Sequence, residues 1–148
     1  MRGLLKLSTR GICVSPGELE VLTPEECLAL LGQAKVGRVG VNVLAIPEIF
    51  PVNFCLLKGA ILFRTGEGTK LHAATRGQIV AFEVDDFDND VRQGWSVLVI
   101  GHSMEIRHPS EIIAARRLLS DTWVPTERYH VVRIVPERMT GRRISERA

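Results

Sequence analysis

The connections between strand-like segments are mostly too short for helical crossovers, and this constrains the fold more than any other feature. Segments 49–57 and 60–65, for example, are separated only by Lys58-Gly59, a turn of hairpin length. Parallel strands need crossovers of a dozen or more residues. The pattern therefore predicts a mainly β (α+β) domain, a six-stranded antiparallel barrel with two or three short flanking helices. The six expected strands are 39–44, 49–57, 60–65, 79–84, 95–106 and 129–135.

The expected helices carry clear start signals. Thr23-Pro24-Glu25-Glu26 combines a capping residue, a proline at the first helical position and a glutamate three residues after the cap, which predicts a helix over 24–31. Pro109 begins a second helix, and residues 69–76 are expected to form a helical turn or two. The stretch 85–94 is rich in aspartate and is expected to be an acidic loop.

Length, charge and cysteine content narrow the class of protein. A chain of 148 residues with 45% hydrophobic residues fits one globular domain; we expect an arm at residues 1–20 and a single domain at 21–148. A net charge of +2 argues against nucleic acid as a partner, and no apolar run reaches the roughly 20 residues of a membrane span. Three cysteines without a C-x-x-C pair favour reduced thiols and a cytoplasmic location.

The most informative stretch for chemistry is 63–70, Phe-Arg-Thr-Gly-Glu-Gly-Thr-Lys. A strand ends here, two glycines allow a tight turn, and backbone N–H groups at such a turn attract an anion. Arg64 and Lys70 add cations, and Thr65 and Thr69 add hydroxyl groups. The stretch therefore predicts a phosphate site, with a solvated charged turn as the alternative; it is neither a P-loop nor a dinucleotide fingerprint.

Other candidate residues give weaker signals. Trp95 at a strand start could cover a planar ligand and Ser96 could donate to its carbonyl, although a core or interface role for the tryptophan is the alternative. The four histidines show no ligand spacing, and the aspartates of 85–90 do not match a calcium loop. No metal site is expected, and the catalytic residues stay unknown. A barrel this small would hold a large ligand on its outside or at a subunit boundary.

Several motifs, in this order and spacing, carry a family resemblance that spans about residues 22–144. They are 36–39 (VGRV), 50–54 (FPVNF), 63–71 (FRTGEGTKL), 82–86 (FEVDD), 94–97 (GWSV), 132–134 (VRI) and 140–144 (TGRRI). The chain resembles the pyridoxamine 5′-phosphate oxidase-like superfamily of FMN-binding split β-barrels, and among them the short actinobacterial-type members.

The resemblance implies an oxidoreductase that binds FMN in grooves formed by both chains of a homodimer, with NADH or NADPH as a possible electron donor. It implies that Arg64, Thr65, Thr69 and Lys70 bind the phosphate and ribityl end. It further implies that Pro51, Val52 and Asn53 line one edge of the flavin ring, and that Trp95 and Ser96 approach the ring.

Two alternatives stay open at the level of sequence. A deazaflavin could replace FMN, with Arg38, Arg76, Arg142 and Arg143 serving its acidic tail. The chain could also be a non-catalytic carrier or sensor of flavin or heme. The ending 142–147 does not reproduce the substrate segment of the true pyridoxamine phosphate oxidases, so the resemblance does not extend to the vitamin B6 reaction.

Overall fold

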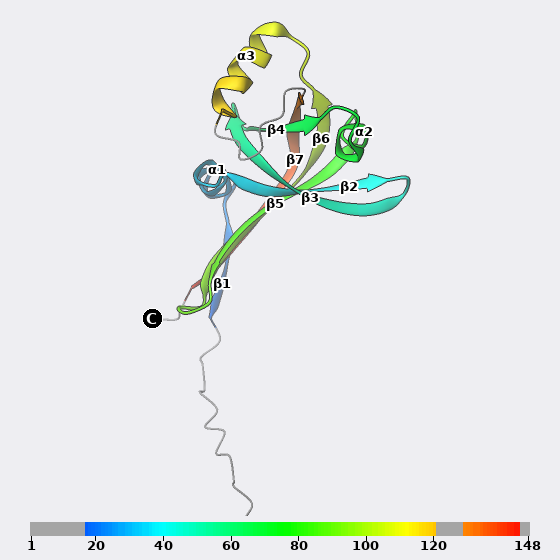
Figure 1. Ribbon diagram of the computed structural model, residues 1–148. Helices are drawn as coiled ribbons and strands as arrows, with labels where there is room; N and C mark the ends of the chain where they lie inside the picture. Colours follow the sequence, from blue (N-terminus) through cyan, green and yellow to red (C-terminus); the bar gives the residue numbers. More distant parts are fainter. Residues whose placement is uncertain (1–16, 121–128, 146–148) are drawn as a thin grey trace, which may run out of the picture.

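The computed structural model describes residues 17–120 and 129–145, which form seven strands and three helices (Figure 1). Every strand pairing in this part of the chain is antiparallel. The elements are β1 (Glu18–Leu22), α1 (Pro24–Gln33), β2 (Val36–Val43), β3 (Ile46–Leu57), β4 (Ala60–Gly66), α2 (Lys70–Ala74), β5 (Ile79–Asp88), β6 (Gln93–Glu105), α3 (Pro109–Leu118) and β7 (Tyr129–Ser145).

Six strands close into a barrel because β7 pairs along two different neighbours. The order is β1-β7-β4-β3-β2-β5-β6, and β7 pairs again with β6 to complete the ring. Residues 129–134 of β7 pair with β4, and residues 132–144 pair with β6. The predicted six-stranded antiparallel barrel is therefore confirmed, with β1 as a seventh strand added at the far end of β7.

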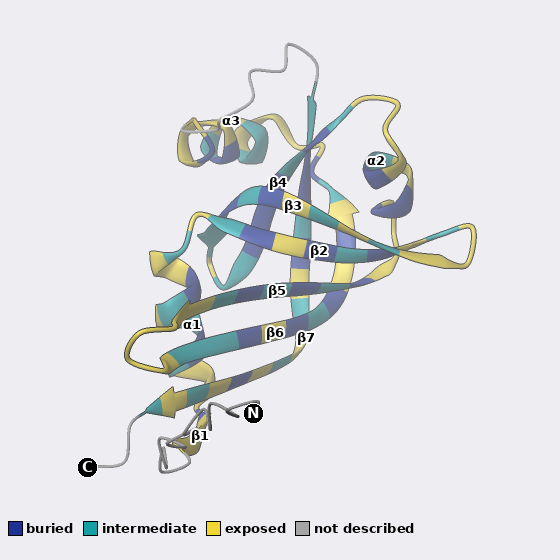
Figure 2. Ribbon diagram, turned by 60° about the horizontal axis from the view of Figure 1, so that its bottom comes forward, coloured by how far each residue is buried: buried dark blue, intermediate teal, exposed yellow. Residues whose placement is uncertain are grey.

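The barrel has an inner core and a smaller outer one, which explains the unbroken apolar run at 61–63. Ile61 and Phe63 point into the inner core, whereas Leu62 points outward and packs with Ala115 and Leu119 of the α3 region. All three β4 residues are fully buried. A strand covered on both faces needs apolar residues at successive positions rather than alternation. The banded colouring of the other strands shows the usual alternation (Figure 2).

The helix α1 begins as predicted. Glu26 N–H donates to Thr23 Oγ1 (3.2 Å), and Thr23 N–H donates to the Glu26 carboxylate (2.7 Å), which completes the capping box. Cys27 and Leu31 of this helix are fully buried in the inner core. Burial raises the pKa of the Cys27 thiol, and it raises that of Cys55 to about 11. Both described cysteines are free thiols.

Several predicted strand bounds were wrong, because backbone pairing rather than side-chain type decides where a strand stops. Residues 85–88, expected in an acidic loop, extend β5 and pair with residues 93–96 of β6. The strand expected at 129–135 continues to Ser145, since β6 and β1 supply partners for its polar second half. Pro47, expected in a connection, pairs with Asn42 of β2.

The predicted N-terminal arm falls mostly outside the described residues. Its last residues, from Glu18, are part of β1 and pair with the end of β7. None of the helices in residues 17–120 and 129–145 has the length and apolar character that crossing a membrane requires.

At Gly101 the backbones of β6 and β7 approach each other closely. The register of β6 and β7 shifts between Ile100 and Gly101. A Cβ at Gly101 would lie 2.1 Å from the carbonyl oxygen of Val135 and 2.9 Å from its carbonyl carbon. Since the clash is with backbone, Gly101→Ala is expected to lower the free energy of unfolding by about 1–3 kcal/mol.

Denaturant unfolding checks this, with Gly32→Ala as the control. A Cβ at Gly32 of α1 meets only Leu56 Cδ1 at 3.9 Å, so alanine there should maintain or raise stability by up to about 1 kcal/mol. Equal stability of Gly101→Ala and the wild-type chain would contradict the prediction.

Candidate functional site

A cavity of about 550 Å³ lies between the middle of β3, the end of β4 and the start of α2. Its volume is in the range of small-molecule and cofactor sites. Seven of the nine residues expected to bind a cofactor line it. The lining residues are Phe50, Pro51, Val52, Asn53, Arg64, Thr65, Gly66, Thr69, Lys70 and Leu71.

The turn between β4 and α2 brings the polar residues together. Gly68 has φ +74°, a left-handed conformation that suits glycine. Thr69 then caps α2: its hydroxyl donates to the Gly66 carbonyl (2.7 Å) and accepts from the His72 N–H (3.1 Å). The Thr69 N–H also donates to the Gly66 carbonyl (3.3 Å). These groups therefore hold the turn itself, and fewer of them are available to an anion than the sequence predicts.

The two cations of the cavity differ in their surroundings. Lys70 is largely exposed, and its Nζ lies 3.6 Å from the Glu48 carboxylate of β3. The guanidinium carbon of Arg64 lies 4.4 Å from the centre of the Tyr129 ring, a cation–π contact that fixes the side chain over β7. An anion entering the cavity can therefore displace Glu48 from Lys70 while Arg64 stays held in place.

Thr65 is 1% exposed and is the most deeply buried polar residue of the cavity wall. Its hydroxyl lies 3.0 Å from His72 Nδ1. Burial and the neighbouring His130 lower the pKa of His72, against the opposing influence of Glu105. A neutral His72 has one N–H and one bare nitrogen, so its tautomer decides whether Thr65 accepts from or donates to it.

Trp95 and Ser96, the remaining two expected residues, are not at the cavity. They lie near the start of β6, opposite Asp86 and Asp85 of β5 and opposite Arg143 and Arg142 of β7. Trp95 packs partly against the inner core and lines a separate hollow at the ends of β5 and β7. Within one chain the structure does not bring them together with the other seven residues.

The arginines considered for a deazaflavin tail also lie elsewhere. None of Arg38, Arg76, Arg142 and Arg143 lines the cavity. Arg38 Nη1 lies 3.3 Å from Asp85 and 3.6 Å from Glu83, and Arg143 Nη1 lies 3.3 Å from Glu20.

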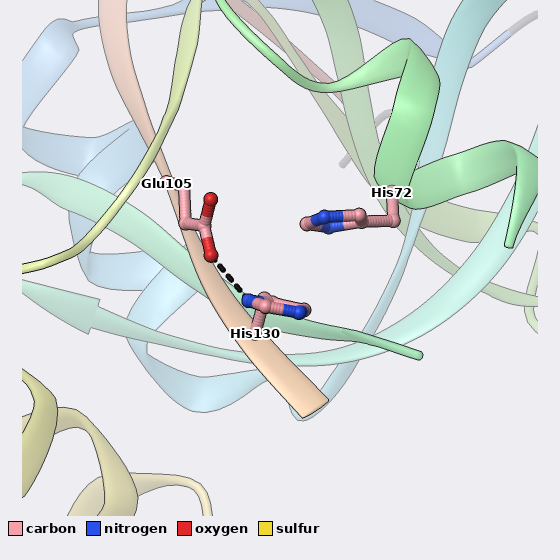
Figure 3. Close-up of side chains that lie close together, drawn as sticks. All are labelled: His72, Glu105 and His130. Atoms are coloured by element: carbon pink, nitrogen blue, oxygen red, sulfur yellow. Dashed lines mark ion pairs between the residues drawn. The ribbon is translucent and has the colours of Figure 1, made fainter. Parts of the chain in front are cut away.

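Sequence reasoning missed a group of three side chains beside the cavity. His72 of α2, Glu105 at the end of β6 and His130 at the start of β7 point toward one another (Figure 3). Their spacing along the chain carries no motif, so no local signal could have found them. They meet because β7 runs between β4 and β6: His130 pairs with Thr65, and Glu105 pairs with Val132.

Three comparisons with known proteins each find relatives of this chain. A family model described as pyridoxamine 5′-phosphate oxidase matches residues 23–143. An uncharacterized protein of Mycobacterium tuberculosis is 37% identical in an alignment of 142 residues that covers 93% of this chain and 93% of that protein. The solved FAD binding protein of Mycobacterium smegmatis is 40% identical with a TM-score of 0.77, over 85% of this chain and 98% of that one.

A conserved Corynebacterium diphtheriae protein of unknown function is 35% identical with a TM-score of 0.72, over 85% of this chain and 98% of that one. The chain belongs to the pyridoxamine 5′-phosphate oxidase family. The resemblance expected from the motifs, and the split-barrel fold it implies, are confirmed.

The cap at Thr69 is open to a direct test. Thr69→Ala removes the acceptor for the His72 N–H and is expected to cost about 0.5–2 kcal/mol of local stability. Hydrogen exchange at the His72 amide, measured by NMR, should accelerate accordingly. Thr69→Ser retains the hydroxyl and is the matched control; equal acceleration in both variants would show that the cap hydroxyl is not what protects the turn.

Proposed function

We propose that this chain is a flavoprotein, an FMN-dependent oxidoreductase that works as a homodimer. The observation that carries the proposal is the two-ended chemistry of the 550 Å³ cavity. At one end lie the cations Arg64 and Lys70 with the hydroxyls of Thr65 and Thr69. An apolar wall of Phe50, Pro51, Val52 and Leu71 forms most of the rest, with Asn53 and Gly66.

Each part of the cavity suits one part of a flavin nucleotide. A phosphate is recognised by cations and hydroxyl donors, and each hydrogen bond to a charged group contributes about 1.5–3 kcal/mol. The Thr69 hydroxyl donates its hydrogen to the Gly66 carbonyl, so a phosphate would gain its bond only if that hydroxyl turns. The apolar wall suits the planar ring, and the amide of Asn53 offers both donors and an acceptor to the polar edge of such a ring. The residues present therefore fit the cofactor that the family resemblance implies.

The side chains around the cavity point to chemistry supplied by the cofactor. No histidine, cysteine or carboxylate is among the lining residues in the described part of the chain. When bound, the flavin would supply hydride and electron transfer, and the protein would supply binding and orientation. NADH or NADPH is the electron donor we propose.

The homodimer is supported by the outer face of the barrel next to the cavity. Ile49, Gly40, Ala81 and Ile100 form one cross-strand row on β3, β2, β5 and β6. The buried Val39, Val80 and Val99 beside them in sequence point inward, so this row points outward. Small residues in the middle and a 73% exposed Ile49 at one end make a face that a second copy can approach closely.

This face adjoins the cavity, since Ile49 precedes Phe50 of the cavity wall. The two expected residues that the chain's own cavity lacks, Trp95 and Ser96, lie on the same strand as Ile100 of this row, five and four residues before it. In a homodimer they can come from the second chain. The free thiols of Cys27 and Cys55 support the cytoplasmic location that we propose with this function.

FAD is the second candidate cofactor. The observation that favours it is the 40% identity to the FAD binding protein of Mycobacterium smegmatis. Both nucleotides share the flavin ring and a phosphate, so the same cations would serve either. Titration of the purified protein with FMN, FAD, riboflavin and a deazaflavin, followed by flavin fluorescence and the visible spectrum, separates them. No flavin bands and no binding at micromolar concentrations would reject both.

Lys70→Ala tests the phosphate end of the cavity. If its ammonium contacts the phosphate, the variant is expected to weaken FMN binding by about 1.5–3 kcal/mol. Riboflavin, which has no phosphate, should bind equally well to both proteins. Isothermal titration or fluorescence quenching provides the dissociation constants.

Two further variants control this experiment. Arg38→Ala removes a cation that lies outside the cavity and pairs with Asp85, so FMN binding should not change. Glu48→Gln removes the carboxylate 3.6 Å from Lys70 and should maintain or strengthen FMN binding. Equal weakening of FMN and riboflavin by Lys70→Ala would place Lys70 away from the phosphate.

Ala81→Arg tests the homodimer. A charge in the middle of the small-residue row is expected to cost about 3–5 kcal/mol if it is buried without a partner. Light scattering should then report half the wild-type mass, and FMN affinity should fall. Ile113→Arg, at a 55% exposed position of α3, is the control and should leave both unchanged. A dimer that persists in Ala81→Arg would contradict the proposed interface.

A further inference from the structure

The three side chains His72, Glu105 and His130 form the second chemical centre of the molecule (Figure 3). One potential ligand atom from each lies within 4.8 Å of the others, and all three residues are partly buried. In residues 17–120 and 129–145 this is the one such group of three histidine, cysteine or carboxylate side chains. It lies apart from the lining of the large cavity, although Thr65 contacts both.

We propose that His72, Glu105 and His130 bind a divalent transition-metal ion, with Zn²⁺ as its representative. Two imidazole nitrogens and one carboxylate oxygen are a donor set that zinc and its first-row neighbours accept. Calcium and magnesium need mainly oxygen ligands, so this set selects against them. Three protein ligands leave a position of the ion open to water or to a small anion.

The hydrogen bond between His72 and Thr65 assigns the nitrogens of His72. Since Nδ1 lies 3.0 Å from the Thr65 hydroxyl, it can carry the proton and donate it there. That leaves Nε2 unprotonated and available to a metal. Metal-binding histidines usually donate their other N–H to such a neighbour, which fixes both the tautomer and the orientation of the ring.

The group has one carboxylate, Glu105, and several cations around it, Arg107 and Arg116 in the adjoining hollow and Arg76 near His72. Glu105 is held at 15% side-chain exposure, and one of its oxygens pairs with His130 Nδ1. Its other oxygen lies 3.7 Å from Arg107, whose guanidinium opposes a second cation. Arg107 is 75% exposed and can turn into solvent when an ion binds.

Binding requires a small rearrangement of the side chains. The two rings stack with centroids 4.2 Å apart and planes inclined by 23°, so their lone pairs do not yet converge. Tetrahedral ligands at about 2.0–2.1 Å from zinc are about 3.4 Å from one another. The most separated ligand atoms, up to 4.8 Å apart, must therefore approach by up to about 1.4 Å, whereas the paired atoms of Glu105 and His130 must move apart. A rotation of either partly exposed ring about its side-chain bonds can supply this change.

A hollow of about 520 Å³ adjoins the group and is lined by Glu105 and His130, with Tyr129, Arg107 and Arg116 among the other residues. The arginines make it suitable for a small anionic ligand at the open position of the ion. This proposal does not depend on flavin binding, because none of the three ligands lines the flavin cavity.

Metal binding is tested on the full chain after removal of any polyhistidine tag and dialysis against a chelator. Isothermal titration with Zn²⁺ and the visible spectrum with Co²⁺ should both report one ion per chain. The variants are His72→Ala, His130→Ala and Glu105→Gln. The last of these keeps the size and shape of the side chain and removes only its charge. Replacing a residue that only hydrogen-bonds a metal ligand already weakens metal binding by about 10–100-fold. Each ligand variant should therefore weaken Zn²⁺ binding by at least this factor.

His102→Ala is the matched control. His102 forms an ion pair with Glu137 of the same kind as the His130–Glu105 pair, but no third potential ligand lies beside it in the described part of the chain. The His102→Ala variant should bind Zn²⁺ like the wild-type chain. Circular dichroism should show that every variant is folded. Absence of saturable binding by the wild-type chain, or unchanged binding by all three ligand variants, would overturn the proposal.

Discussion

The fold and both sites depend on one strand, β7, which pairs with three others. Its first residues pair with β4, residues 132–144 pair with β6, and its end pairs with β1. Only the β6–β7 pairing closes the ring, and the tight approach at Gly101 marks where the register shifts to permit it. The position of β7 also sets the site chemistry, because it places Tyr129 under Arg64 and His130 beside Glu105.

Local signals in the sequence were enough for most of the barrel. The Lys58-Gly59 turn, the capping box at Thr23 and the alternation of apolar residues need only near neighbours, and the structure contains each as expected. The closure of the barrel was harder to predict, because the second half of β7 is polar and pairs with β6 and β1, which are distant in sequence. The aspartates at 85–88 suit a loop by composition, yet hairpin pairing with β6 extends the strand through them.

The residues of the sites likewise divide into those that local sequence signals predict and those that only the fold brings together. The stretch 63–70 holds cations, hydroxyls and glycines within a few residues, so its cavity could be expected from spacing alone. Other residues of the site come from the strand β3: Phe50 lines the cavity, and Glu48 pairs with Lys70. Trp95 and Ser96 share a family motif with this stretch but lie outside the cavity of their own chain. Residues 72, 105 and 130 have no sequence signal, because only the barrel's closure unites them.

Thr65 lines the cavity and also contacts His72 of the group His72, Glu105 and His130. A count of its hydrogen bonds shows how it links the two sites. A hydroxyl has one hydrogen to donate and can accept from other groups. If His72 Nδ1 is bare, Thr65 must donate to it and has no hydrogen left for a ligand in the cavity. If His72 Nδ1 carries the proton, Thr65 accepts it, and its own hydrogen is free to point at a phosphate. A group or ion bound at Nε2 of His72 would therefore decide between these two arrangements. A buried threonine that is 1% exposed thus makes the donor set of the cavity depend on a histidine that does not line it.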